Sequence, residues 1–141
     1  LQNRGVLEDY GMDDGSDSTF QYAGTNFDMY IFTEGIELVY DAQGNLDSIY
    51  GPGLVFYFES SSSNSSKLAV GTYTYQPNSP FSVGSFDYSY YTDVDFTGGG
   101  DITGGTFTVS TSGNTYTIVF DLTDSAGKKI TGTFTGTFDI I

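Results

Sequence analysis

The chain has 141 residues, with 18 acidic residues against four basic ones, and a formal net charge of -14 at pH 7. It contains neither cysteine nor histidine, which excludes thiol nucleophiles, Ser-His-Asp and Cys-His triads, and zinc or iron sites built on these ligands. The strong negative charge also excludes nucleic-acid binding, because like charges repel. No stretch approaches the roughly 20 consecutive apolar residues of a membrane helix.

The first 18 residues are acidic and carry few apolar side chains. They read LQNRGVLEDYGMDDGSDS, a composition that buries too little apolar surface to offset the cost of ordering the chain. We therefore expect residues 1–18 to form a flexible acidic leader, followed by a single all-β domain over residues 19–141.

Short runs of β-branched and aromatic residues follow, separated by Gly, Pro, Asn and Ser. Such runs predict strands joined by tight turns. The run at 26–33 has apolar residues on both faces, as does the run at 54–59, which indicates strands that are covered on two sides or whose outer face meets a partner. The serine-rich segment 60–67 predicts an exposed flexible loop. Strands are expected at 19–23, 26–33, 36–40, 46–50, 54–59, 68–76 and 81–92.

The last third, residues 104–138, has the clearest pattern. It alternates apolar residues with threonine and serine over three runs, and this period of two is typical of strands with one packed and one solvated face. Asp-x-x-Gly stands between two such runs, at Asp124–Gly127, and also between two earlier ones, at Asp41–Gly44. We expect both hairpins to use the same turn.

Nearly all of these connections are short, so strands that are neighbours in sequence should be neighbours in space. The sequence predicts an antiparallel meander of about nine strands. An up-and-down, lipocalin-like barrel, closed or flattened, is the favoured arrangement because closure removes exposed edges. The alternative is a two-sheet β-sandwich or jelly roll, which would need crossovers at 60–67 and 93–103.

Two sets of carboxylates are candidates for chemistry. Asp93, Asp95 and Asp101 surround a glycine-rich loop, and such hard oxygen ligands suit weak calcium binding; the alternative is an ordinary charged loop. Glu34, Glu37 and Glu59 lie near strands and could form a glycosidase pair if a cleft held two of them. Alternation with apolar neighbours favours solvent-facing charges instead, so no catalytic residue is nominated.

Twelve tyrosines are the most distinctive surplus in the composition. Tyr73 and Tyr75 share one face of their strand, and Tyr88 and Tyr90 share a face with Phe86 on the next one. Either pair could stack on sugar rings or line a barrel pocket. The alternative is cross-strand packing, for which tyrosine is equally well suited. We name Tyr73, Tyr75, Tyr88 and Tyr90 as candidate ligand-binding residues.

The segment GGTFTVSTSGNTYTIVFDLTDSAGKKITGTFTG, residues 104–136, together with AVGTYTY, residues 69–75, resembles a group of uncharacterised exported proteins and lipoproteins of Bacteroides-type bacteria. The shared motifs are structural and carry no catalytic residues. The resemblance implies an all-β fold and export, with a lipid anchor at a cysteine ahead of Leu1 as one form of attachment.

These observations lead to a non-enzymatic, exported domain at the cell surface or outside the cell, which binds a glycan or a small apolar ligand through aromatic residues. A structural or adhesive module that contacts another protein through the two-sided strands is the first alternative. A carboxylate-based glycoside hydrolase is the second. Apart from weak calcium binding, no cofactor is expected.

Overall fold

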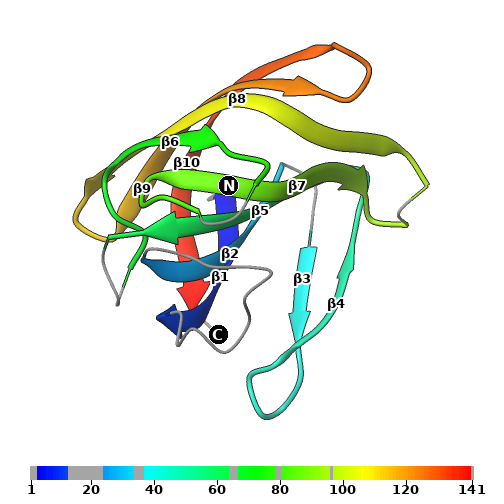
Figure 1. Ribbon diagram of the computed structural model, residues 1–141. Helices are drawn as coiled ribbons and strands as arrows, with labels where there is room; N and C mark the ends of the chain where they lie inside the picture. The colour runs from blue at the N-terminus through cyan, green and yellow to red at the C-terminus, as the bar shows by residue number, and fades with distance from the viewer. Residues whose placement is uncertain are drawn as a thin grey trace.

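The computed structural model describes residues 3–12, 24–33, 37–63, 67–78, 81–95 and 97–140. Eight strands close into a barrel in the order β1-β10-β9-β8-β6-β7-β5-β2, and β3 and β4 form a separate two-stranded hairpin beside it (Figure 1). No helix among the described residues is long and apolar enough to cross a membrane. The strands are β1 (Asn3–Met12), β2 (Thr25–Phe32), β3 (Glu37–Tyr40), β4 (Leu46–Tyr50), β5 (Leu54–Ser62), β6 (Gly71–Tyr75), β7 (Ser85–Asp93), β8 (Gly99–Ser112), β9 (Thr115–Asp124) and β10 (Lys129–Ile140).

The barrel confirms the all-β prediction, but the strands are not a simple antiparallel meander. β8, β9 and β10 form the expected antiparallel run, whereas β1 pairs with β10 in parallel and β6 pairs with β7 in parallel. β6 lies between β7 and β8 at one end, and β7 pairs directly with β8 at the other. These pairings are non-local, so short connections alone could not predict them. The expected strand at 19–23 lies outside the described residues.

The expected leader contains a barrel strand. β1 lies between β2 and β10 and closes the barrel, and both Val6 and Leu7 are fully buried. The prediction of a flexible segment is therefore wrong for residues 3–12, because two buried side chains and backbone pairing on both edges offset the ordering cost that the acidic composition suggested. Residues 13–23 lie outside the described part of the chain.

The barrel interior is filled by closely packed aromatic rings. Phe58 packs against Phe86, Phe107 and Phe120, with ring centroids 5.6, 5.0 and 5.7 Å away. Apolar residues of seven other strands complete this core, among them Leu7, Met29 and Ile118, which are fully buried. As the alternation predicts, Phe27, Met29 and Ile31 of β2 point inward.

The outer face of the same wall carries a second apolar cluster. Val6, Phe32 and Val55 are 0, 5 and 3% exposed, and Tyr30 and Val94 pack against them. This cluster explains why β2 and β5 have apolar residues on both faces, as the sequence indicated. Each of these strands separates an aromatic interior from an aromatic exterior.

The serine-rich segment also differs from the expected flexible loop, because its first three residues extend β5. Ser60, Ser61 and Ser62 are buried and pair with β2. The Ser60 hydroxyl donates a hydrogen bond to the carbonyl of Phe27, and the Ser61 hydroxyl accepts one from the Gly24 N–H. A serine is small, and when its hydroxyl is hydrogen-bonded to the backbone it can be buried in the barrel wall, although a serine-rich composition predicts an exposed loop.

Candidate functional site

The barrel has an apolar pocket at one mouth. It has a volume of about 420 Å³ and is lined by the end of β2, the start of β5, Phe120 of β9 and the segment Ile130–Phe134 of β10. The described pairing of β1 extends to Ile31 on one side and to Gly136 on the other. The pocket lies beyond both points, past the last pairings that are described between β1 and its two neighbours. Its lining residues are Ile31, Phe32, Thr33, Leu54, Phe56, Phe120, Ile130, Thr131, Gly132, Thr133 and Phe134.

Gly132 is the residue that leaves this space empty. Ile130 and Phe134 both pack on the interior core, so Gly132 between them faces inward by the alternation of the strand. A β-carbon placed at Gly132 would have no heavy atom within 4 Å. The pocket therefore exists because an inward position has no side chain, and a larger residue there would occupy it.

The walls of the pocket are aromatic and its rim is uncharged. Phe56 stacks on Phe120 at 5.8 Å with an interplanar angle of 16°, and on Tyr91 at 5.9 Å with an angle of 26°. At the rim, the Thr33 hydroxyl accepts a hydrogen bond of 2.7 Å from the Leu54 backbone. No charged side chain occurs among the described lining residues. An uncharged apolar molecule is the ligand that such a surface can bind without leaving a charge desolvated.

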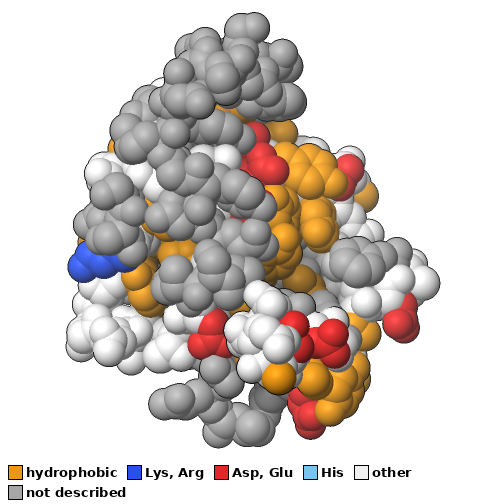
Figure 2. All heavy atoms as spheres, turned by 90° about the horizontal axis from the view of Figure 1, so that it is seen from below, with side chains coloured by type: hydrophobic (Ala, Val, Ile, Leu, Met, Phe, Trp, Pro, Cys, Tyr) orange, Lys and Arg blue, Asp and Glu red, His pale blue; other side chains and the backbone are white. Residues whose placement is uncertain are grey.

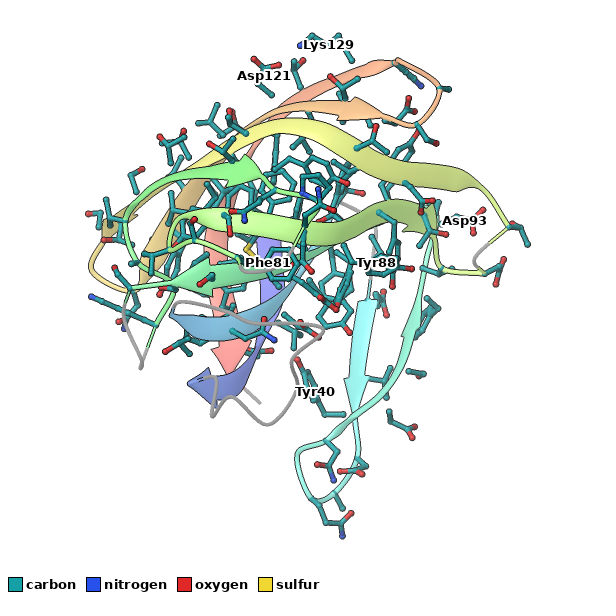
Figure 3. All side chains as sticks on the ribbon, in the orientation of Figure 1. Tyr40, Phe81, Tyr88, Asp93, Asp121 and Lys129 are labelled. Atoms are coloured by element: carbon teal, nitrogen blue, oxygen red, sulfur yellow. The ribbon has the colours of Figure 1, made fainter. Side chains whose placement is uncertain are left out.

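A row of tyrosines crosses the outer face of the barrel. The pairing registers place Tyr30 of β2 opposite Tyr57 of β5, Tyr57 opposite Tyr90 of β7, and Tyr90 opposite Asp101 of β8. Tyr57 and Tyr90 stack with centroids 5.0 Å apart and planes 28° apart. Tyr88, which is 59% exposed, lies with its edge toward both rings. Figure 3 shows Tyr88 on β7, with Asp93 where that strand ends.

Tyr57 anchors this row. It is 6% exposed, and its hydroxyl donates a hydrogen bond of 3.0 Å to Glu59 Oε1. Burial, together with the carboxylates of Asp28 and Glu59, holds the pKa of Tyr57 well above its usual value of 10. Burial likewise raises the pKa of Tyr90. Both phenols therefore stay protonated and can act as hydrogen-bond donors over the whole physiological range.

The four candidate tyrosines are divided between the two faces of the wall. Tyr73 is 2% exposed and stacks on Phe107 at 4.8 Å, and Tyr75 packs against Phe86 in the same interior. These two are core residues, as the cross-strand alternative held. Tyr88 and Tyr90 point outward.

The expectation that Phe86 shares their face is wrong, because the pairing of β5 with β7 shifts register between Phe58 and Ser60. Phe58 lies opposite Ser89, and Ser60 lies opposite Phe86, so β7 has one residue more than β5 over this interval. Such a bulge reverses the alternation of side chains, which leaves Phe86 inside and Tyr88 and Tyr90 outside.

Of the candidate calcium residues, Asp93 has a turn-forming role in the described structure. Asp93 accepts hydrogen bonds from the backbone N–H groups of Asp95 and Thr97 and from the Thr97 hydroxyl. The Thr97 bonds hold the pKa of Asp93 below its usual range. Asp101 is instead opposite Tyr90. No group of three or more Asp or Glu side chains in the described part of the chain is arranged to hold a metal ion, so this geometry gives calcium binding no support.

The two Asp-x-x-Gly turns are built alike, as predicted. Asp41 accepts bonds from the backbone N–H groups of Gln43 and Asn45, and Asp124 accepts them from Ala126 and Lys128. Asp93 uses the same pattern with residues two and four positions later. Of the three candidate calcium ligands, Asp93 is thus a turn residue whose carboxylate caps backbone groups.

Charge on the exposed surface points to ligands that are not anionic. In the view of Figure 2, acidic side chains lie at several points around an area of hydrophobic side chains, and basic side chains are visible only at one edge. Lys129 is engaged at the surface with Asp121 at 3.1 Å (Figure 3). With a net charge of -14, the protein repels anions over its surface as a whole.

Searches for known relatives returned no match: no protein-family model, no curated protein and no solved structure matches this chain. The two sites described above therefore stand on their own geometry.

Proposed function

We propose that this chain is a non-enzymatic binding domain whose barrel mouth takes a small, neutral, apolar molecule. The observation that carries the proposal is the pocket of about 420 Å³ with walls formed by Phe56, Phe120 and Phe134. Small-molecule sites occupy about 300 to 1,000 Å³, are mostly apolar and are often found in the mouths of β-barrels. A dry apolar cavity of about 150 Å³ is enough for benzene, so this pocket has room for about three aromatic rings.

Export to the cell surface or beyond belongs to the same proposal. It is supported by the acidic composition, rich in Ser, Thr, Tyr and Gly, and by the resemblance carried by residues 104–136. A domain without cysteine needs no particular redox compartment, so the fold itself is equally compatible with either side of a membrane.

The alternatives gain less from the structure. The apolar outer residues Phe32 and Val55 are buried, which leaves the two-sided strands with less exposed apolar surface than an adhesive module would use. Glu37 accepts a bond from Tyr50 on the β3–β4 hairpin, and Glu59 accepts one from Tyr57 on the barrel wall. Neither is among the residues that line the pocket, and Glu34 lies outside the described residues.

The test is to fill the pocket. Gly132→Leu places a side chain into the empty space, and N-phenyl-1-naphthylamine, a neutral probe with about 17 heavy atoms, reports binding by its fluorescence. At about -0.3 kcal/mol per atom the probe should bind with a Kd of roughly 0.2 mM or below. We expect Gly132→Leu to weaken binding at least about tenfold, the equivalent of roughly 1.4 kcal/mol.

The matched control is Thr135→Leu. Thr135 is exposed on the same strand and lies opposite Thr117, so this variant adds the same side chain outside the pocket and should bind the probe like the wild type. Circular dichroism and thermal melting establish that both variants are folded. If a folded Gly132→Leu protein binds the probe with unchanged affinity, or if the wild type does not bind it saturably, the pocket is not the ligand site.

A further inference from the structure

A second hollow lies outside the barrel and shares no lining residue with the mouth pocket. It has a volume of about 300 Å³ and lies where β7 meets β8, with Tyr88 and Tyr90 on one side and Gly98, Gly100 and Asp101 on the other. The row of tyrosines described above ends at this hollow, since Tyr90 and Asp101 are directly opposite each other. One exposed aromatic surface and one exposed carboxylate therefore face the same space.

The aromatic side of the hollow is supported by contacts within the row of tyrosines. Tyr90 stacks on Tyr57, and Tyr57 is held in turn by its contact with Tyr30 at 5.0 Å and by its bond to Glu59. Tyr88 contacts both Tyr57 and Tyr90 edge-on, at 6.1 and 5.7 Å. A preorganised platform loses little side-chain freedom when a ligand stacks on it, which keeps the entropic cost of binding low.

We propose that this hollow is a binding site for a neutral saccharide, with a sugar ring stacked on Tyr88 and hydroxyl groups donating to Asp101. An aromatic side chain offers an apolar face to the C–H groups of a sugar ring, and its own hydroxyl stays available to water or ligand. A carboxylate accepts several hydrogen bonds and matches the donors of adjacent sugar hydroxyls. Gly98 and Gly100 complete the lining of the hollow, together with Tyr91 and Thr92.

Charge selects the class of saccharide. Asp101 is exposed, and no lysine or arginine occurs among the described residues that line the hollow. The whole chain carries a net charge of -14, so a uronic acid, sulfated or phosphorylated sugar would be repelled. A neutral saccharide meets only hydrogen-bond partners and apolar surface.

An organic cation is the other ligand that tyrosine and aspartate could attract, but the ring geometry disfavours it. Cation recognition is strongest where aromatic faces surround the charge, each with its centroid within about 6 Å. Tyr88 and Tyr90 are 5.7 Å apart with planes at 65°, so the rings touch each other and leave no space between them. What they offer is a one-sided surface, which suits a flat ring.

The experiment is a calorimetric titration of the full chain with four neutral oligosaccharides, the cello-, xylo-, manno- and malto-hexaoses. The highest concentration is about 10 mM, which is ten times the Kd that corresponds to a binding free energy of about -4 kcal/mol. We expect saturable binding to at least one member. Tyr88→Ala should weaken it about tenfold, and Asp101→Ala about fivefold or more, because each removes one of the two contacts.

Tyr50→Ala is the matched control. Tyr50 is also an exposed tyrosine, at 51%, but it lies on the β3–β4 hairpin and bonds to Glu37, so its loss should not change saccharide affinity. Gly132→Leu should bind saccharide like the wild type, which separates this site from the barrel mouth. The proposal is overturned if no hexaose binds, if Tyr88→Ala binds as well as Tyr50→Ala, or if tetramethylammonium binds where the saccharides do not.

Discussion

The adjacent glycines Gly104 and Gly105 on β8 allow a sharp test of how the barrel wall is built. Gly105 has φ +101°, in the left-handed region that favours glycine, and a β-carbon there would lie 2.1 Å from the carbonyl oxygen of Asp121 and 2.7 Å from the α-carbon of Leu122 on β9. At Gly104 the nearest atom to a β-carbon would be the Thr123 β-carbon at 3.8 Å, an ordinary contact. The pairing of β8 with β9 changes register next to these residues.

We therefore predict that Gly105→Ala is strongly destabilising and Gly104→Ala is not. A strained φ costs of order 1 to 3 kcal/mol, and the two strands must also separate by roughly 1 Å to relieve contacts that real β-carbons avoid. Together these give a loss of at least about 2 kcal/mol for Gly105→Ala, or about 8 °C in melting temperature if 1 kcal/mol corresponds to roughly 4 °C at this size. For Gly104→Ala the reduced entropy of the unfolded chain gives a change between zero and a gain of about 1 kcal/mol.

Chemical denaturation of both variants and the wild type, followed by circular dichroism, measures these differences. An equal m-value for the three proteins shows that the same surface is exposed on unfolding. Equal stabilities for Gly104→Ala and Gly105→Ala would refute the reasoning, because the two substitutions differ only in the backbone angle and in what the added carbon meets.

Two further predictions concern pH. The folded pKa of Tyr57 lies above its unfolded value of 10, so the protein should lose stability as pH rises above about 10. In thermal melts, the melting temperature of Tyr57→Phe should fall less steeply with alkaline pH than that of the wild type. An identical fall in the two proteins would contradict the buried phenol flanked by carboxylates. Hydrogen bonds from the backbone of Lys128 and from Tyr91 hold the pKa of Asp124 below 3.8, so its contribution is complete above that pH and is lost as pH falls through the folded value. The melting temperature of Asp124→Asn should then change less than that of the wild type between about pH 5 and 2, and a parallel decline would show that this turn carries no charge-dependent stability.

Local features of the fold were predictable because they depend on neighbours in sequence. The alternation of apolar and polar residues predicted which side chains of β2, β9 and β10 point inward. The Asp-x-x-Gly pattern predicted two turns that the structure confirms. The strand at residues 3–12 could not be found in this way. Its pairing with β10 joins the two ends of the chain, and its acidic composition hides two buried residues among charged ones.

The candidate sites show the same division. Tyr88 and Tyr90 were identifiable as a pair, but their separation from Phe86 depends on a bulge that only the pairing with β5 reveals. The mouth pocket was missed because its cause is an absent side chain. A signal did exist, since Gly132 interrupts an inward row between Ile130 and Phe134, and a glycine at an inward position of a strand often marks a space or a close approach.

The two proposed sites share one strand, and Tyr91 links them, because it stacks on Phe56 of the mouth pocket and also lines the outer hollow. On β5, Phe56 faces the interior, where it stacks on Tyr91 and Phe120, while Tyr57 faces outward and stacks on Tyr90. Because adjacent residues of a strand point to opposite faces, a side chain that fills the mouth lies on the side of Phe56, opposite to Tyr57 and Tyr90. The wall thus carries the two proposed sites on opposite faces, and saccharide titration of Gly132→Leu tests whether the outer hollow binds when the mouth is filled.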